Sequence, residues 1–145
     1  MGYDLIAKKK DAEDLSIGAF SWPHMLQETG MGYVLGYGAN FKPGTYVYQS
    51  GRKGSPSSND GYRVTSFEAK AMAAVARGYV SVNRFINKQY EEMPEDERKG
   101  YENALYHGDE GIVRKLYLQP VSEDYLKKLE KFADFAEKSG GFEIH

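Results

Sequence analysis

Aromatic and charged side chains that could together bind a phosphorylated ligand are concentrated in the first half of the chain. Tyrosine and phenylalanine recur between residues 33 and 48, and Arg52, Lys53, Asn59 and Asp60 follow them. Aromatic rings stack on nucleobases, and arginine or lysine pairs with phosphate. We therefore predict that a nucleotide-like small molecule is bound by Tyr37, Tyr48, Arg52, Lys53, Asn59 and Asp60. The alternative is that the tyrosines form cross-strand pairs on a small sheet.

A second group of basic side chains recurs at helical spacing farther along the chain. Lys70, Arg77, Arg84 and Lys88 fall on one side of a predicted long helix. Such a stripe could bind phosphate or an acidic partner. The alternative is a solvated helix face whose cations pair with neighbouring carboxylates.

The residue patterns typical of enzymes and metal sites are missing from the sequence. His24, His107 and His145 do not have the spacing of zinc ligands, and the chain contains no cysteine. No serine lies in a nucleophile elbow, and the segment GRKGS departs from the spacing of a phosphate-binding loop. We therefore expect no metal, no cofactor and no catalytic residues, which favours a non-catalytic protein.

Composition further restricts the class of protein. The formal net charge of −2 argues against nucleic acid as a partner. No apolar run approaches the roughly 20 residues that a membrane span needs, and the lack of cysteine suits a reducing compartment. We expect a cytoplasmic protein without a membrane partner. The 12 tyrosines are also compatible with a homo-oligomer, because tyrosine suits protein interfaces.

A change in composition near residue 61 divides the chain into two parts of one predicted domain. Residues 1–61 are rich in glycine and tyrosine and predict mostly strands and loops, whereas residues 62–145 are more charged and predict mostly helix. Residues 1–145 are therefore expected to form a single α+β domain. Its small sheet of short strands is predicted to pack against one long and two or three shorter helices.

Short strands and one helix are predicted in the first part. Residues 3–8 are a plausible strand, and residues 32–38 and 45–49 are rich in tyrosine and valine, which favour strands. Ser21 can cap a short helix. The segment SPSSNDG has the residues of a turn. However, the connection over residues 50–61 is longer than a turn needs, and long loops are often functional.

The main helix of the second part is predicted to begin at Ser66 and to end near Glu92. Thr65 and Glu68 form the T-x-x-E pattern of a capping box. Apolar spacing predicts a buried face that contains Phe67, Ala71, Val75, Gly78, Val82 and Ile86, with Met72, Tyr79 and Tyr90 beside them. On such a face, Val82→Asp would bury an unpaired charge and prevent folding. Gly78 weakens the helix by about 1 kcal/mol relative to alanine, or it lets a neighbour pack closely.

The remaining elements are predicted from capping and terminating residues. A helix between Pro94 and Gly108 would carry His107 in its last turn. It is followed by a strand within residues 111–118, a helix capped by Ser122 and ended by Gly140 and Gly141, and a strand at residues 142–145.

Three segments resemble a family of small, uncharacterised phage and bacterial proteins. They are MGYDL at the start, SNDGYRVTSFEAKAMA in the middle and FADFAEKSGGFEI at the end. None of the three is a catalytic signature. The resemblance implies a phage setting, in which small cysteine-free proteins often bind and block a host component, and some sequester nucleotide signals of host immunity.

Two functions are therefore expected from the sequence. The first is a non-catalytic binding protein that sequesters a phosphorylated, nucleotide-like ligand to counter host defence. The second is a protein-interaction or oligomeric assembly module without a small-molecule ligand. If the chain is phage-encoded, either function would be carried out in the cytoplasm of the host cell.

Overall fold

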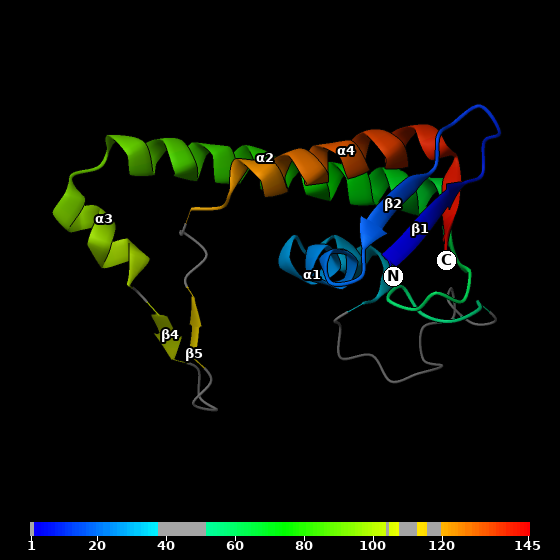
Figure 1. Ribbon diagram of the computed structural model, residues 1–145, viewed down its shortest axis with the longest axis horizontal. Helices are drawn as coiled ribbons and strands as arrows, with labels where there is room; N and C mark the ends of the chain where they lie inside the picture. The colour runs from blue at the N-terminus through cyan, green and yellow to red at the C-terminus, as the bar shows by residue number, and fades with distance from the viewer. Residues whose placement is uncertain (1, 38–51, 104, 108–112, 116–119) are drawn as a thin grey trace.

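The fold combines a small antiparallel sheet with helices, and it is therefore of the predicted α+β class (Figure 1). The structure is a computed structural model that describes residues 2–37, 52–103, 105–107, 113–115 and 120–145. Within these residues, the sheet strands are β1 (Gly2–Ala7), β2 (Leu15–Gly18), β3 (Tyr62–Thr65) and β6 (Gly141–Ile144). The helices are α1 (Ser21–Glu28), the 3₁₀ helix η1 (Met31–Leu35), α2 (Ser66–Glu92), α3 (Glu95–Glu102) and α4 (Glu123–Ser139).

The C-terminal strand β6 lies inside the sheet, between β1 from the start of the chain and β3 from its middle. The strand order is β2-β1-β6-β3, and each neighbouring pair is antiparallel. Ile144 of β6 lies opposite Leu5 of β1 and opposite Tyr62 of β3. These three side chains are buried, whereas Ile6 and Arg63 lie on the other face of the sheet and are exposed. The helices therefore cover one face of the sheet only.

Helix α2 begins and ends as the sequence predicts. The Thr65 hydroxyl accepts a hydrogen bond from the Glu68 backbone N–H at 3.1 Å, and the Glu68 carboxylate accepts one from the Thr65 N–H at 3.0 Å. This reciprocal pair is the predicted capping box, and it confirms the start at Ser66. The long helix runs side by side with α4 (Figure 1), and the two helices make the most extensive contact between elements.

The predicted buried face of α2 is wrong by roughly a third of a turn. Phe67 is 83% exposed and Val82 is 45% exposed, so Val82→Asp is no longer expected to prevent folding. Ile86 is buried as expected, and Val75 is partly buried. The face that packs on the core consists of Ala69, Met72, Ala73, Ala76, Tyr79, Val80, Asn83, Ile86 and Tyr90. Its alanines let α4 approach closely. Met72, Tyr79 and Tyr90, which were predicted beside the buried face, are buried on it.

One predicted strand of the first part differs from the structure. Residues 32–38 were expected to form a strand, but the 3₁₀ helix η1 lies there instead. Gly30 and Gly36 at its two ends have left-handed φ angles of 80° and 74°, which turn the backbone away from an extended path. The strand predicted at residues 45–49 lies outside the described residues.

His107 also lies in a different element from the one predicted. It ends strand β4 (Leu105–His107), which pairs with β5 (Val113–Lys115), instead of lying in the last turn of a helix. Helix α3 already ends at Glu102. β5 falls within the strand that was predicted at residues 111–118.

The C-terminal helix and strand form as predicted, and they complete the core. Ser122 caps α4, and its hydroxyl accepts a hydrogen bond from the Tyr125 N–H at 3.3 Å. Gly140 follows α4 with a left-handed φ of 70°. Phe132 of α4 packs between Trp22 and Phe142, with ring centroids 5.4 and 6.1 Å away. None of the described helices has the length and apolar character that crossing a membrane requires.

Candidate functional site

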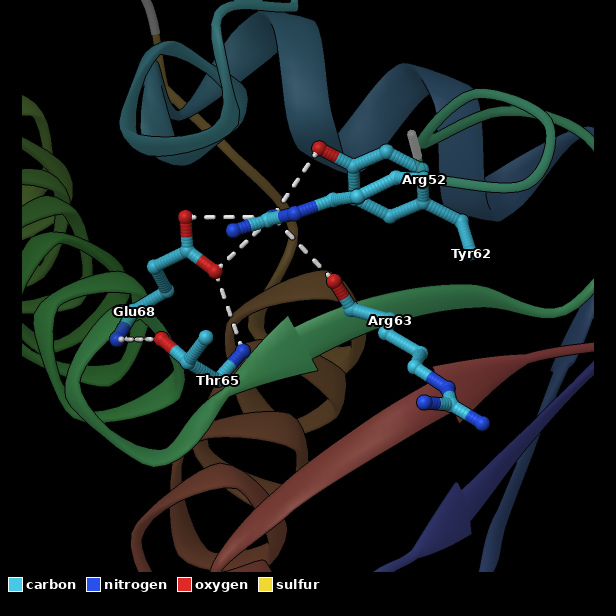
Figure 2. Close-up of polar contacts among 5 residues, drawn as sticks. All are labelled: Arg52, Tyr62, Arg63, Thr65 and Glu68. Carbon is cyan, nitrogen blue, oxygen red and sulfur yellow. Dashed lines mark hydrogen bonds and ion pairs between the residues drawn. The ribbon is translucent and has the colours of Figure 1, made fainter. Parts of the chain in front are cut away.

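Arg52, the central cation of the predicted ligand site, forms hydrogen bonds and an ion pair with other residues of the same chain (Figure 2). Its Nη1 donates hydrogen bonds to the Tyr62 hydroxyl at 3.2 Å and to the backbone carbonyl of Arg63 at 3.1 Å. The same nitrogen lies 3.0 and 3.2 Å from the two carboxylate oxygens of Glu68. Glu68 also belongs to the capping box, so one side chain from the loop holds both the start of α2 and the end of β3.

The pair of Arg52 and Glu68 is almost entirely shielded from water. Their side chains are 12% and 7% exposed. Burial of the guanidinium opposes its charge, but the hydrogen bonds to Glu68 and Tyr62 outweigh burial and raise the pKa of Arg52 above its usual value. The positive charge of Arg52 is therefore compensated inside the fold, which leaves less of it to attract an anion.

The loop that follows Arg52 is held in place by side chains from distant parts of the chain. The indole Nε1 of Trp22 donates to the carbonyl of Pro56 at 2.8 Å, and the Tyr3 hydroxyl donates to the carbonyl of Ser57 at 2.7 Å. The Asn59 side-chain amide donates to the carbonyl of Gly2 at 3.1 Å. These bonds fasten the loop to α1 and β1, which gives its length a structural explanation.

The six residues of the predicted ligand site therefore have different surroundings. Arg52 and Asn59 make the structural bonds just described, whereas Lys53 and Asp60 are exposed. Tyr37 follows η1 and packs against the core. Tyr48 lies outside the described residues.

The predicted basic stripe is divided between paired and exposed side chains. Arg77 forms ion pairs with Asp134 at 2.6 Å and Glu137 at 2.7 Å, and Arg84 pairs with Glu123 at 2.7 Å and with Glu130. The hydrogen bond from Arg77 lowers the pKa of Glu137. Lys70 and Lys88 are exposed on α2. The two arginines thus join α2 to α4, which agrees with the alternative interpretation of paired carboxylates.

Two hollows on the surface have mixed charges. One of about 630 Å³ lies between the β1–β2 connection and α4, and carboxylates such as Asp14 and Glu137 alternate there with Lys9 and Lys131. Another of about 470 Å³ lies near the start of α2, where Arg63 is paired with Glu143 at 3.0 Å. Among the residues that the structure describes, no cluster of histidine, aspartate and glutamate is suited to a metal ion.

The side of α2 that points away from the core carries a row of apolar and small residues. We call this row the α2 solvent face, and it consists of Phe67, Ala71, Ala74, Gly78, Ser81 and Phe85. Phe67 and Phe85 at its ends are 83% and 63% exposed, and Val82 lies beside it. Exposed apolar side chains that recur along one side of a regular helix are a mode of protein recognition by helices.

Three residues of this row, Phe67, Ala71 and Gly78, were predicted from the apolar spacing to lie in the core, which is wrong. In the sequence, Gly78 is the residue that distinguishes a solvent-facing row from a buried one. A glycine in the middle of a helix destabilises the helix, and this one gains nothing from packing inside the fold. Among the residues that the structure describes, and apart from the nearby backbone of α2 itself, no atom lies within 4 Å of a Cβ placed on Gly78. The fold itself therefore does not require a glycine at this position.

Comparisons with known proteins identify no relative of this chain. No protein-family model, no curated protein and no solved structure matches it. The choice of the candidate site therefore depends on the geometry of the protein itself, and the α2 solvent face is the surface that this geometry favours.

Proposed function

We propose that this protein is a non-catalytic assembly module that binds another protein chain through the α2 solvent face. The observation that carries the proposal is the exposure of Phe67 and Phe85, at 83% and 63%, on the same side of one helix. Burying a phenylalanine side chain stabilises a complex by about 1.5–3 kcal/mol, so two such residues can anchor an interface.

The rigidity of α2 supports this proposal. The opposite side of the helix is fixed in the core by buried residues such as Met72 and Tyr79, and its start is fixed by the capping box. Salt bridges from Arg77 and Arg84 hold it against α4. A surface that is already ordered loses little conformational entropy when a partner binds.

Sequestration of a phosphorylated ligand has less support. Arg52 is compensated by Glu68, and Arg77 and Arg84 are compensated by carboxylates of α4. Lys53, Lys70 and Lys88 are exposed, but surface lysines alone do not form a pocket. If the resemblance to phage proteins holds, an assembly module of this kind would act by occupying a component of the host cell.

The proposal predicts that the α2 solvent face is covered in the cells that make the protein. Since the chain contains no cysteine, a single Ala74→Cys variant places one thiol on this face. Lys128→Cys places the matched control thiol on an exposed position of α4. The rate of labelling by a membrane-permeant maleimide is measured for both variants in cells and after denaturation.

We expect the thiol at position 74 to react at least about tenfold more slowly than the control in cells, because a bound chain excludes the reagent. After denaturation, the two thiols should react at similar rates. Equal reactivity in folded protein inside cells would contradict the proposed function. If the thiol at position 74 is protected in cells but reacts freely in the purified, concentrated protein, the partner is a different protein.

A further inference from the structure

We propose that the chain bound to the α2 solvent face is a second copy of the same protein, with its α2 running in the opposite direction. This inference rests on the proposed function and names the partner of that surface. The two helices would be related by a twofold axis at the level of Ala76. Phe67 of each copy would then lie against Phe85 of the other.

The spacing of the exposed residues is that of a helix–helix seam. Positions 67, 71, 74, 78, 81 and 85 are separated alternately by four and three residues, which averages the 3.5 residues of a coiled coil. The buried residues of α2 lie on the opposite side, so the helix has one face for its own core and a separate one for a partner.

The order of large and small residues along the seam is the same from either end. A phenylalanine lies at each end, at positions 67 and 85, and only alanine, glycine and serine lie between them. An antiparallel pair would bring Ala71 next to Ser81 of the second copy and Ala74 next to its Gly78. A twofold interface needs such a self-complementary surface, because each contact occurs twice.

Gly78 provides an independent indication that another backbone approaches here. In the described part of a single chain, a Cβ added to Gly78 would contact no side chain and no other element within 4 Å, which leaves room for a second helix beside it. A glycine lets two helices approach more closely than a larger residue would, which offsets its unfavourable helix propensity. Its place near the middle of the row is where the two helices would cross most closely.

The charges beside the seam are compatible with the antiparallel direction. Arg84 is shared by two carboxylates, Glu123 and Glu130. The exposed Lys88 and Lys127 lie within one helical turn of these groups. In an antiparallel pair, the exposed Lys70 of one copy lies close to the level of these carboxylates in the other. Near the axis, each Arg77 is paired with Asp134 and Glu137 of its own α4, so neither arginine is an uncompensated cation.

The area of the face approaches the lower limit of what a stable dimer needs. The exposed parts of Phe67 and Phe85 from two copies would together contribute on the order of 500 Å². The seam between them extends over about 27 Å of helix, at about 1.5 Å per residue. With the surface of the small residues and of Val82, the total approaches the roughly 1,200 Å² of a stable interface.

Cross-linking between two single-cysteine variants tests both the partner and the direction. Purified Ala71→Cys and Ser81→Cys proteins are mixed and oxidised, and each disulfide-linked species is identified by mass. We expect the mixed disulfide between positions 71 and 81 to accumulate. Disulfides between identical positions should not accumulate, because those residues would lie about 15 Å apart along the helix, beyond the Cα distance of about 7 Å that a disulfide spans.

Two matched glycine substitutions complete the test. Gly78→Gln adds a side chain at the centre of the seam and should abolish the mixed disulfide. Gly100→Gln adds the same side chain at an exposed helical position in α3, also with open space around it, and should leave the yield unchanged. Disulfides between identical positions would overturn the antiparallel arrangement. An absence of cross-links, or equal yields of the mixed disulfide with Gly78→Gln and Gly100→Gln, would overturn the dimer. In that case, protection of the thiol at position 74 in cells would still support a different protein as the partner.

Discussion

Replacing Arg52 with methionine is expected to lower the free energy of unfolding by about 3–5 kcal/mol. Methionine keeps much of the apolar stem but removes the guanidinium, so Glu68 would retain a charge that is shielded from water and lacks this cation. The carbonyl of Arg63 and the hydroxyl of Tyr62 would also each lose a hydrogen bond. The effect is measured by urea denaturation followed by circular dichroism.

The control for this prediction is the same substitution at an exposed ion pair. Arg63 pairs with Glu143, but its side chain is 81% exposed, so Arg63→Met should change the free energy of unfolding by less than about 1 kcal/mol. The double variant Arg52→Met with Glu68→Gln removes the uncompensated charge and should recover a large part of the lost stability. Equal effects of Arg52→Met and Arg63→Met would show that Arg52 is not a structural cation.

Trp22→Ala is expected to lower the free energy of unfolding by about 3–5 kcal/mol. The indole is fully buried and packs against Phe132 and Phe142, so its removal leaves a cavity between α1, α4 and the sheet. The carbonyl of Pro56 would also lose its hydrogen bond from the indole N–H. The measurement is again the denaturation midpoint and the slope of the transition.

A milder substitution separates the packing of Trp22 from its role as a loop anchor. Trp22→Phe keeps an aromatic ring in the core but removes the donor to Pro56, and it should cost about 1–3 kcal/mol. The loop over residues 52–61 should then become more susceptible to proteolysis while α2 and α4 remain protected. If Trp22→Phe and wild type were cleaved at the same rate in this loop, the hydrogen bond would not be what holds it.

The elements that the sequence predicts correctly are those determined by neighbouring residues. The capping box of Thr65 and Glu68 and the serine at position 122 act over three residues, so they locate the starts of α2 and α4 without knowledge of the fold. The left-handed Gly140 similarly determines the end of α4. Strand β6 is predicted because its apolar residues follow directly after this stop.

Contacts between distant residues account for the parts that the sequence does not predict. Arg52 was assigned to a ligand site because its partner Glu68 lies 16 positions away in a different element. The bond from Trp22 to Pro56 spans 34 positions. The buried face of α2 depends on how closely α4 packs against it, which the apolar spacing of α2 alone does not determine. The exposed Phe67 therefore resembled a core residue until the position of α4 was known.

The mass of the unmodified protein in solution shows whether two copies bind each other through the α2 solvent face. Light scattering is measured over a range of protein concentrations, with Gly78→Gln and Gly100→Gln treated in the same way. We expect wild type and Gly100→Gln to approach twice the chain mass of 16.3 kDa, whereas Gly78→Gln should remain at the mass of one chain. A wild-type protein with the mass of one chain at every concentration would contradict the claim that the α2 solvent face binds a second copy.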